Sequence, residues 1–299
     1  MVDQKYLQII RKSFPEVSEE QINVFDDGWD YLVLVVNGQN VFRFPRTKRE
    51  MYLQRLSTEA NFLKQFYSKS PVLVPKSELH TDESEGSYVT YDFIPGVQFS
   101  KDLAKTFSKE SLLAIAQELG NFLTVLHSFS IEEAKNLGVK QKDPAIEWKN
   151  NLQEIKNEVF PKISIEERKW ITKLYEDFLE LIQVSPFIAR VIHFDIMLEH
   201  IIVDPDTQKL SGIIDFTDME IADPALDFSI LHQYGDEFLQ EVYKYYQLPR
   251  DNNFEQRRKF YNNRLVVAYL KHSLKINDQK RIEKHKKQLS EYIENNPLT

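Results

Sequence analysis

Cysteine is absent from this chain of 299 residues. The protein can therefore form no disulfide, bind no zinc through thiolates and use no cysteine nucleophile. Histidine, aspartate, glutamate, serine and lysine remain as candidates for chemistry. Long apolar runs are absent as well: no stretch reaches the roughly 18 residues of a membrane span, and residues 1–6 begin no signal peptide. We expect a cytoplasmic protein without membrane partners.

Positive charge is scarce, because Lys and Arg total 38 against 46 for Asp and Glu, a net charge of −8. An acidic surface disfavours nucleic acid and favours cationic or neutral partners. Part of the surplus is local, because the chain between Lys209 and Lys244 carries acids and no Lys or Arg. Those acids are Asp215, Asp218, Glu220, Asp223, Asp227, Asp236, Glu237 and Glu241.

The first third of the chain combines strand and helix patterns. Asn37-Gly38 between two β-rich runs is a strong hairpin signal. Beyond Gly96 the pattern becomes helical, with two short apolar stretches at 190–193 and at 200–204 with 210–216. The predicted strands are 22–26, 30–36, 40–45, 76–80 and 87–93, and the predicted helices are 5–14, 52–67, 109–128, 146–157, 165–182, 224–246, 254–273 and 277–294. This order predicts an α+β protein with a small antiparallel sheet followed by a larger helical part.

One constellation carries chemistry: His193-Phe194-Asp195, then His200, then Ile213-Ile214-Asp215. Phosphoryl transfer needs a carboxylate that orients and deprotonates the acceptor hydroxyl, and further ligands that hold magnesium on the phosphates. Taken singly, each Asp is typical of a turn and each His of a satisfied core residue. Their joint spacing favours phosphoryl transfer.

On these motifs the sequence resembles the aminoglycoside phosphotransferases, antibiotic kinases with a protein-kinase-like fold, and most closely their 2″-phosphotransferase branch. The resemblance covers almost the whole chain. It implies a bilobal fold, with a nucleotide-binding lobe at 1–94, a hinge near 91–95 and a helical lobe at 95–299.

The resemblance also implies residue roles in the catalytic segment. Asp195 is the expected catalytic base, and His193 braces its loop. Asp215 and His200 are the expected Mg²⁺ ligands. Most family members have Asn in place of His200, but some 2″-phosphotransferases and the macrolide phosphotransferases have His there. Magnesium prefers oxygen ligands, so the contact of His200 can also run through water.

For the nucleotide, GTP or ATP, the resemblance implies a second set of residues. Arg43 stands where the family usually has the phosphate-binding Lys, and Glu59 matches its acidic partner. Gly28 alone represents the glycine-rich loop. Three more residues complete the nucleotide set: Asp92 and Ile94 in the hinge, and Ile214. Tyr91 holds the gatekeeper position of that hinge, where a tyrosine accompanies a preference for GTP in the 2″ branch.

The expected substrate contacts are Asp195, Asp218, Asp236 and Glu237. Asp223-Pro224-Ala225-Leu226-Asp227 matches a family motif that we interpret as a helix start. His232-Gln233 replaces acids that bind the drug in the 2″ enzymes, and Thr217 is closer to the macrolide kinases.

We therefore expect a monomeric magnesium-dependent kinase that phosphorylates an aminoglycoside hydroxyl and confers drug resistance. A macrolide or a small metabolite is an alternative substrate on the same fold. A nucleotide- or drug-binding protein without turnover is a further alternative, motivated by Arg43 and His200, and a cleft that is only a solvated acidic face is the third.

Overall fold

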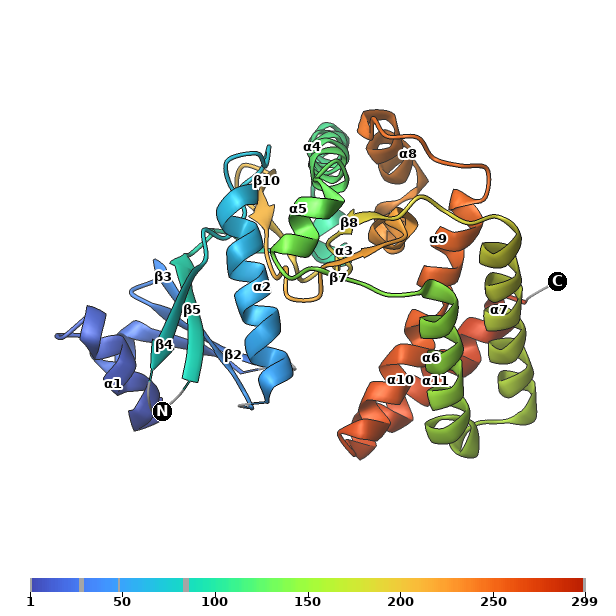
Figure 1. The fold of residues 1–299 in the computed structure, drawn as a ribbon, viewed down its shortest axis with the longest axis horizontal. Coiled ribbons are helices and arrows are strands. Elements are labelled where there is room, and N and C mark those ends of the chain that lie inside the picture. Colours follow the sequence, from blue (N-terminus) through green and yellow to red (C-terminus); the bar gives the residue numbers. More distant parts are fainter. Residues whose placement is uncertain (1, 27–29, 48, 83–85, 298–299) are drawn as a thin grey trace. The chain divides into compact units, whose positions relative to one another are not determined.

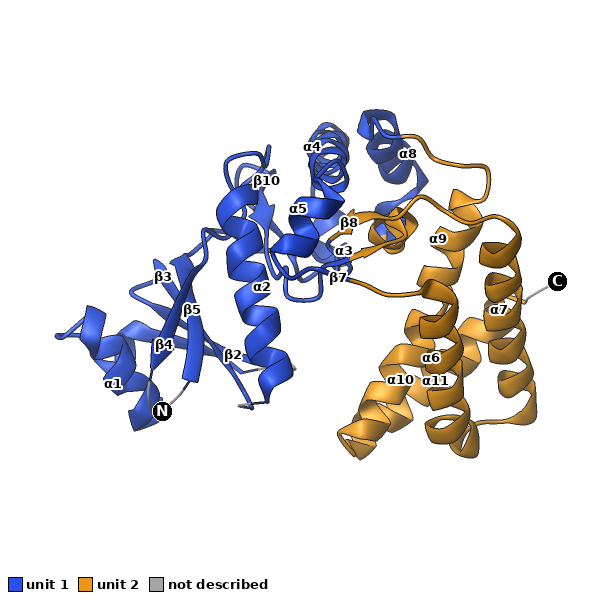
Figure 2. Ribbon diagram, viewed as in Figure 1, with its two compact units in different colours: residues 1–140, 193–220, 231–248 blue, residues 141–192, 221–230, 249–299 orange. Residues whose placement is uncertain are grey.

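The computed structural model describes residues 2–26, 30–47, 49–82 and 86–297, so Gly28 lies outside the described residues. The chain forms two compact units (Figure 2). Unit 1 comprises residues 1–140, 193–220 and 231–248, and unit 2 comprises residues 141–192, 221–230 and 249–299. The α+β class predicted from the sequence is confirmed by the combination of sheets and helices (Figure 1).

Unit 1 holds the strand-rich part of the chain. In chain order its elements are α1 (Gln4–Ser13), η1 (Glu19–Gln21), β1 (Ile22–Phe25), β2 (Tyr31–Val36), β3 (Asn40–Pro45), α2 (Glu50–Phe66), β4 (Glu78–Asp82), β5 (Gly86–Asp92), β6 (Val97–Gln98), α3 (Lys101–Ala104), α4 (Lys109–His127), α5 (Ile131–Asn136), β9 (Ile201–Asp204), β10 (Lys209–Ile213), η4 (Leu231–Tyr234) and α8 (Asp236–Tyr245). The first five strands form an antiparallel sheet in the order β1-β2-β3-β5-β4. A second sheet has the order β10-β9-β6.

The hairpin between β2 and β3 turns where the sequence predicts it. Asn37 has φ 54° and Gly38 has φ 66°, the left-handed pair that matches the twist of a two-residue hairpin loop. Val36 therefore pairs with Asn40, and Val33 pairs with Arg43. This register decides which side chains of β3 share a face.

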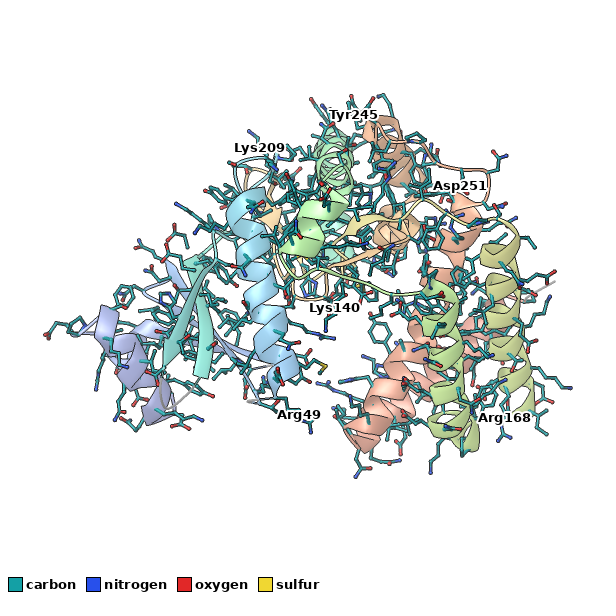
Figure 3. The ribbon with its side chains drawn as sticks, in the orientation of Figure 1. Arg49, Lys140, Arg168, Lys209, Tyr245 and Asp251 are labelled. Atoms are coloured by element: carbon teal, nitrogen blue, oxygen red, sulfur yellow. The ribbon has the colours of Figure 1, made fainter. Side chains whose placement is uncertain are left out.

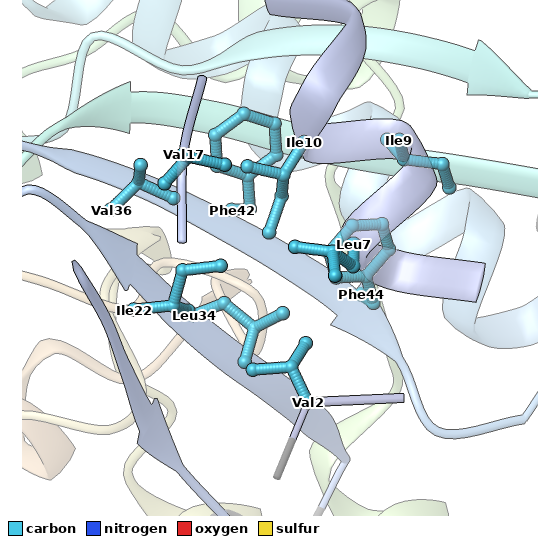
Figure 4. Packing of buried hydrophobic residues seen from close by; sticks show 10 residues of the cluster. All are labelled: Val2, Leu7, Ile9, Ile10, Val17, Ile22, Leu34, Val36, Phe42 and Phe44. Carbon is cyan, nitrogen blue, oxygen red and sulfur yellow. The ribbon is translucent and has the colours of Figure 1, made fainter. Parts of the chain in front are cut away.

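Opposite faces of the five-stranded sheet pack against different helices. Phe42 and Phe44, two residues apart on β3, share one face of the sheet and pack with α1 in one apolar cluster (Figure 4). Tyr31 and Val89 point to the other face and pack against α2. Because side chains along a strand alternate between faces, Arg43 lies on the α2 face.

Unit 2 is mainly helical. Its elements are α6 (Pro144–Glu158), η2 (Phe160–Lys162), α7 (Ile165–Val184), β8 (Arg190–Ile192), η3 (Pro224–Phe228), α9 (Phe254–Asn263), α10 (Leu265–Lys275) and α11 (Gln279–Asn295). The short strands β7 (Lys140–Gln141) and β11 (Glu220–Ala222) each contain one of the points where the chain passes from one unit to the other. They form a sheet with β8 in the order β7-β11-β8.

A buried ion pair anchors unit 2. Arg257 is fully buried, with its Nε 2.6 Å from Asp223 Oδ2 and its Nη2 2.7 Å from Asp251 Oδ2. Asp251, labelled in Figure 3, precedes α9. Asp223 also accepts a hydrogen bond from the Ala225 amide at the start of η3, which confirms the interpretation of Asp223-Pro224 as a helix start.

Two predicted helices differ from the structure. The helix predicted for 224–246 is wrong, because the segment forms η3, η4 and α8 as separate elements. Gly235 interrupts it at φ 111°, a conformation that a right-handed helix cannot contain. The helix predicted for 254–273 is divided into α9 and α10 at Arg264, which keeps helical backbone angles.

The unit boundaries do not divide the chain at residue 94. Beyond the predicted hinge, β6 pairs with β9, and both belong to unit 1. A nucleotide-binding lobe at 1–94 and a helical lobe at 95–299 stay a prediction about function. No helix among the described residues has the length and apolar character needed to cross a membrane.

Candidate active site

Arg43 is the buried cation of the site. Only 3% of the residue is exposed, and its Nη2 donates to Oε2 of Glu59, which is 2% exposed. Glu59 lies on α2, the helix that packs on this face of the sheet. The guanidinium also lies 4.7 Å from the centre of the Tyr31 ring, a cation–π distance. The predicted pair of Arg43 and Glu59 is therefore formed.

The pair reaches the segment that follows β10. Arg43 Nη1 lies 3.1 Å from Oδ1 of Asp215, and the Phe216 amide donates to Oε1 of Glu59 at 3.1 Å. One guanidinium thus bridges two carboxylates. A planar fork with donors on both nitrogens suits this arrangement, because each nitrogen contacts one carboxylate.

Burial and charge shift the pKa values of these groups in opposite directions. Burial raises the pKa of Glu59 to about 7, although Arg43 opposes this shift. Burial alone would also raise the pKa of Asp215, but Arg43 and His200 outweigh it and hold that pKa well below the ordinary range. Burial would lower the pKa of Arg43, and the carboxylates of Glu59 and Asp215 reverse this. Asp215 is accordingly the acid of the site that stays ionised at neutral pH.

The backbone fixes the direction of Asp215. Its φ of 66° is left-handed, which is uncommon for a residue other than glycine. The preceding Ile214 amide donates to the His200 carbonyl at 3.0 Å, and the fully buried His193 donates from Nε2 to the Ile214 carbonyl at 3.2 Å. The Thr217 hydroxyl donates to Oδ1 of Asp215. His193 therefore joins the start of the Asp195 segment to the Asp215 segment, and its predicted bracing of the Asp195 loop stays a prediction.

Asp195 and His200 face each other across a tight turn. His200 Nδ1 lies 2.8 Å from the Asp195 carbonyl oxygen and 3.3 Å from Asp195 Oδ2. Loss of water contact raises the pKa of Asp195, while His200 opposes that shift. Burial would lower the pKa of His200, but Asp195 and Asp215 together raise it above its ordinary value. The structure thus brings together the predicted base and both predicted metal ligands.

The donor atoms fit a cation held jointly with phosphates. The carbonyl of Asp195 only accepts hydrogen bonds, so His200 Nδ1 carries a proton and, in a neutral ring, Nε2 keeps its lone pair. That nitrogen lies 3.8 Å from Asp215 Oδ2. Within the described part of the chain, no group of three or more acidic or His side chains forms a complete metal cage. Magnesium commonly takes only one or two protein ligands and fills its other positions with phosphate oxygens and water.

The predicted hinge continues from β5. Tyr91 and Asp92 end that strand, paired with Val41 and Asn40 of β3. Tyr91 is half-buried on the α2 face of the sheet, and burial raises the pKa of its hydroxyl to about 12. Ile94 is buried, and its side chain approaches Gly212 of β10, just before Ile214. The hinge and the Asp215 segment are therefore neighbours.

The predicted substrate acids separate into two places. Asp218 lies three residues after Asp215 and forms an ion pair with Arg55 of α2 at 2.9 Å. Glu237, in the first turn of α8, instead pairs with Lys109 at the start of α4. Among the described residues, no hydrogen bond or ion pair joins Asp236 or Glu237 to Asp195 or Asp218.

Two contacts escaped the sequence analysis. Arg55 was not singled out, although it lies four residues before Glu59 and so shares its face of α2. Tyr31 was not singled out either. Side chains along β2 alternate between the two faces of the sheet, and this alternation could have placed Tyr31 on the face opposite α1, where it contacts Arg43. Both signals depend on knowing which face of α2 and of the sheet carries the site.

A comparison with protein families identifies the class of this protein. Residues 21–260 match the phosphotransferase enzyme family, APH. Because this range is most of the 299 residues, the chain belongs to that family, and both the predicted resemblance and the expectation of an enzyme are confirmed.

Particular relatives share the fold or part of the sequence. The structure of the GDP and kanamycin complex of APH(2″)-IIIa matches with a TM-score of 0.88 at 23% identity, over 98% of this chain and 100% of that one. A macrolide 2′-phosphotransferase from Brachybacterium faecium matches with a TM-score of 0.70 at 18% identity, over 98% and 99% of the two chains. These likenesses confirm the protein-kinase-like fold.

Among curated proteins, viomycin phosphotransferase from Streptomyces vinaceus is 26% identical over 161 residues. The match takes in 53% of this chain and 54% of that protein, so it spans about half the length of the relative.

Proposed function

We propose that this protein is a magnesium-dependent kinase that transfers the γ-phosphoryl group of GTP or ATP to a hydroxyl of an aminoglycoside and confers resistance to the drug. One observation carries the proposal: Asp195, His200 and Asp215 lie together, and Arg43 joins Asp215 to Glu59. Phosphoryl transfer requires this combination of a base, a cation site and a phosphate-binding cation. We place the protein in the cytoplasm as a monomer.

Asp195 acts on the acceptor in this mechanism. The hydroxyl oxygen attacks the γ-phosphorus, Asp195 takes the hydroxyl proton, and the bond from the γ-phosphorus to the bridging oxygen breaks as the nucleoside diphosphate leaves. His200 bonds to the Asp195 carbonyl and so holds the carboxylate on its turn. Asp215 would hold magnesium, with His200 as a ligand directly or through water, and the cation would supply positive charge to the phosphates.

Arg43 and the hinge receive the nucleotide. The Arg43 guanidinium is fixed by Glu59 and directed at Asp215, so phosphates held at Asp215 come within its reach. Backbone groups of residues 91–94 read the base, with Ile94 and Ile214 against it. Tyr91 favours GTP, in agreement with the GDP complex of APH(2″)-IIIa.

Asp218 supplies a negative charge for substrate ammonium groups, and Asp236 and Glu237 extend the acidic surface. The kanamycin complex of APH(2″)-IIIa supports a cationic substrate of this kind. The net charge of −8 supports it as well, because an acidic surface attracts polycations.

A panel of drugs tests the proposal. Wild-type protein is incubated with GTP or ATP, Mg²⁺ and either kanamycin, gentamicin, erythromycin or choline, and phosphorylated products are detected by mass spectrometry. We expect an aminoglycoside product, formed faster with GTP. Phosphorylation of erythromycin or choline without any aminoglycoside product would contradict the proposed substrate.

A macrolide kinase is the second candidate. The Thr217 hydroxyl donates a hydrogen bond to Oδ1 of Asp215, and at this position the sequence is closer to the macrolide phosphotransferases. The macrolide 2′-phosphotransferase from Brachybacterium faecium also shares the fold over the full chain. The erythromycin arm of the panel separates this candidate from the first.

A further inference from the structure

Arg55 of α2 contacts the acid to which the proposed function assigns a substrate cation. Its Nη1 lies 2.9 Å from Oδ1 of Asp218 and 3.5 Å from Oδ2 of Asp30, the residue before β2. The side chains of all three residues are about one third exposed, at 36%, 38% and 33%. The contact is therefore direct, with no room for water between Arg55 and Asp218, but it borders on solvent.

Arg55 belongs to the same helix face as Glu59, one turn toward the helix start. α2 begins after Arg49, which is labelled in Figure 3, and runs from Glu50 to Phe66. Glu59 is directed by Arg43 toward the Asp215 segment, so the next turn of the helix meets Asp218, three residues later. The position of Arg55 thus follows from the architecture that builds the site.

We propose that Arg55 is an internal cation that occupies the position of a substrate ammonium at Asp218 and so lowers the affinity for polycationic substrates. The inference rests on the proposed function, because it concerns the substrate acid of that site. Arg55 lies beside Asp218 and neutralises its charge, so an ammonium that approaches this carboxylate meets a weaker attraction and the repulsion of a like charge. A cationic substrate therefore gains the full attraction of Asp218 only when Arg55 moves away from it.

Asp30 makes this displacement feasible. It already lies within ion-pair distance of Arg55, so the guanidinium can shift toward Asp30 when a ligand takes Asp218. Because the three side chains are part exposed, water can also solvate the displaced guanidinium. Arg55 is thus a specificity-determining residue: neutral acceptors bind without breaking the pair, whereas polycations compete with it.

Calorimetric binding of kanamycin to the full-length protein tests the inference. Arg55→Gln should bind kanamycin about two- to fivefold more tightly at low salt, the range expected for a part-exposed ion pair. The gain should disappear in the Asp218→Asn background and shrink with added salt. Lys64→Gln, which removes an equal charge from an exposed position on the same helix, is the matched control and should change nothing.

A steady-state measurement separates competition from a structural role. If Arg55 competes with the substrate, Arg55→Gln lowers KM for kanamycin and leaves kcat nearly unchanged. Equal or weaker binding of kanamycin to Arg55→Gln, or no binding to either protein, overturns the inference. If Arg55→Gln binds more tightly but neither protein phosphorylates kanamycin, the inference holds and the proposed substrate fails. Unchanged melting temperatures of Arg55→Gln and Asp218→Asn verify that both variants fold.

Discussion

At the scale of single residues, Asp195 is the proposed general base. Its carboxylate is oriented by a turn in which the Met197 amide donates to the Asp195 carbonyl at 2.8 Å and His200 returns to the same carbonyl. A partly exposed carboxylate whose pKa is raised by burial is a suitable acceptor for a hydroxyl proton.

Asp195→Asn should lower kcat about 10²- to 10⁴-fold, the usual contribution of a general base. Nucleotide binding should stay unchanged, because an amide of the same shape keeps the turn. Single-turnover phosphorylation measures the first effect and equilibrium nucleotide binding the second. Turnover equal to that of the wild type would refute the assignment of Asp195 as base.

Arg43 carries a stability prediction at the same scale. Arg43→Met removes the partner of the buried Glu59, and breaking a buried ion pair in this way costs about 3–5 kcal/mol of unfolding free energy. Denaturant unfolding measures the loss. The double variant with Glu59→Gln should recover part of it, because no buried charge is then left without its partner. A single variant as stable as the wild type would show that the pair contributes nothing to the fold.

At the scale of elements, a close approach between two backbone segments constrains the chain just after the predicted hinge. Gly96 follows β5 with φ 135°, and a Cβ added there would lie 2.4 Å from the Val203 carbonyl oxygen of β9. The chain directly after the predicted hinge therefore needs glycine at residue 96, for its backbone conformation and also for the space beside β9.

Gly96→Ala should destabilise the protein by more than about 1 kcal/mol, since both the backbone angle and the contact with Val203 are unfavourable. Gly38→Ala is the control: it has a left-handed φ of 66°, but an added Cβ meets nothing within 4 Å. Thermal unfolding compares the two. A smaller loss for Gly96→Ala than for Gly38→Ala would contradict the importance of the close approach.

Aromatic packing joins the elements that carry the site. Phe62 and Phe66 of α2 stack with ring centres 5.2 Å apart, and Phe216, next to Asp215, lies 6.2 Å from both Phe66 and Phe122 of α4. Aromatic pairs at these separations contribute stability beyond that of burying their apolar surface. The Asp215 segment is thus held by apolar packing on one side and by Arg43 and Glu59 on the other.

At the scale of the whole molecule, a nucleotide bound as proposed would link several segments far apart in sequence. Arg43, Ile94 and Asp215 come from β3, the hinge and the segment after β10, and all belong to unit 1. A ligand that binds only the folded chain stabilises it by mass action.

GTP with Mg²⁺ at 100 times its dissociation constant should add roughly 2.7 kcal/mol to the unfolding free energy and raise the melting temperature. Chelation of magnesium should remove most of that gain, and Asp215→Asn should show little dependence on magnesium. Differential scanning calorimetry measures each shift. An unchanged melting temperature with GTP or ATP and magnesium would favour the interpretation of the cleft as a solvated acidic face.

The sequence by itself determined the local features of this protein. The turn preference of Asn37-Gly38 predicts the hairpin, and the spacing of apolar residues predicts the helices α2 and α4. The motif that contains Asp195, His200 and Asp215 is visible in the order of the residues alone. Such features depend on neighbours in sequence, so they are legible without the fold. The division of 224–246 into separate elements was not predictable in this way. The amphipathic pattern continues through Gly235, but the helical backbone is interrupted there.

Only the tertiary structure decided which charges meet. Arg43 bridges Glu59 and Asp215 across 16 and 172 residues of sequence, and Arg55 forms an ion pair with Asp218. Asp236 and Glu237 continue the acidic run in sequence, yet Glu237 pairs with Lys109. An ion pair depends on the distance between atoms, and for residues far apart in the chain that distance is set by how helices and strands pack.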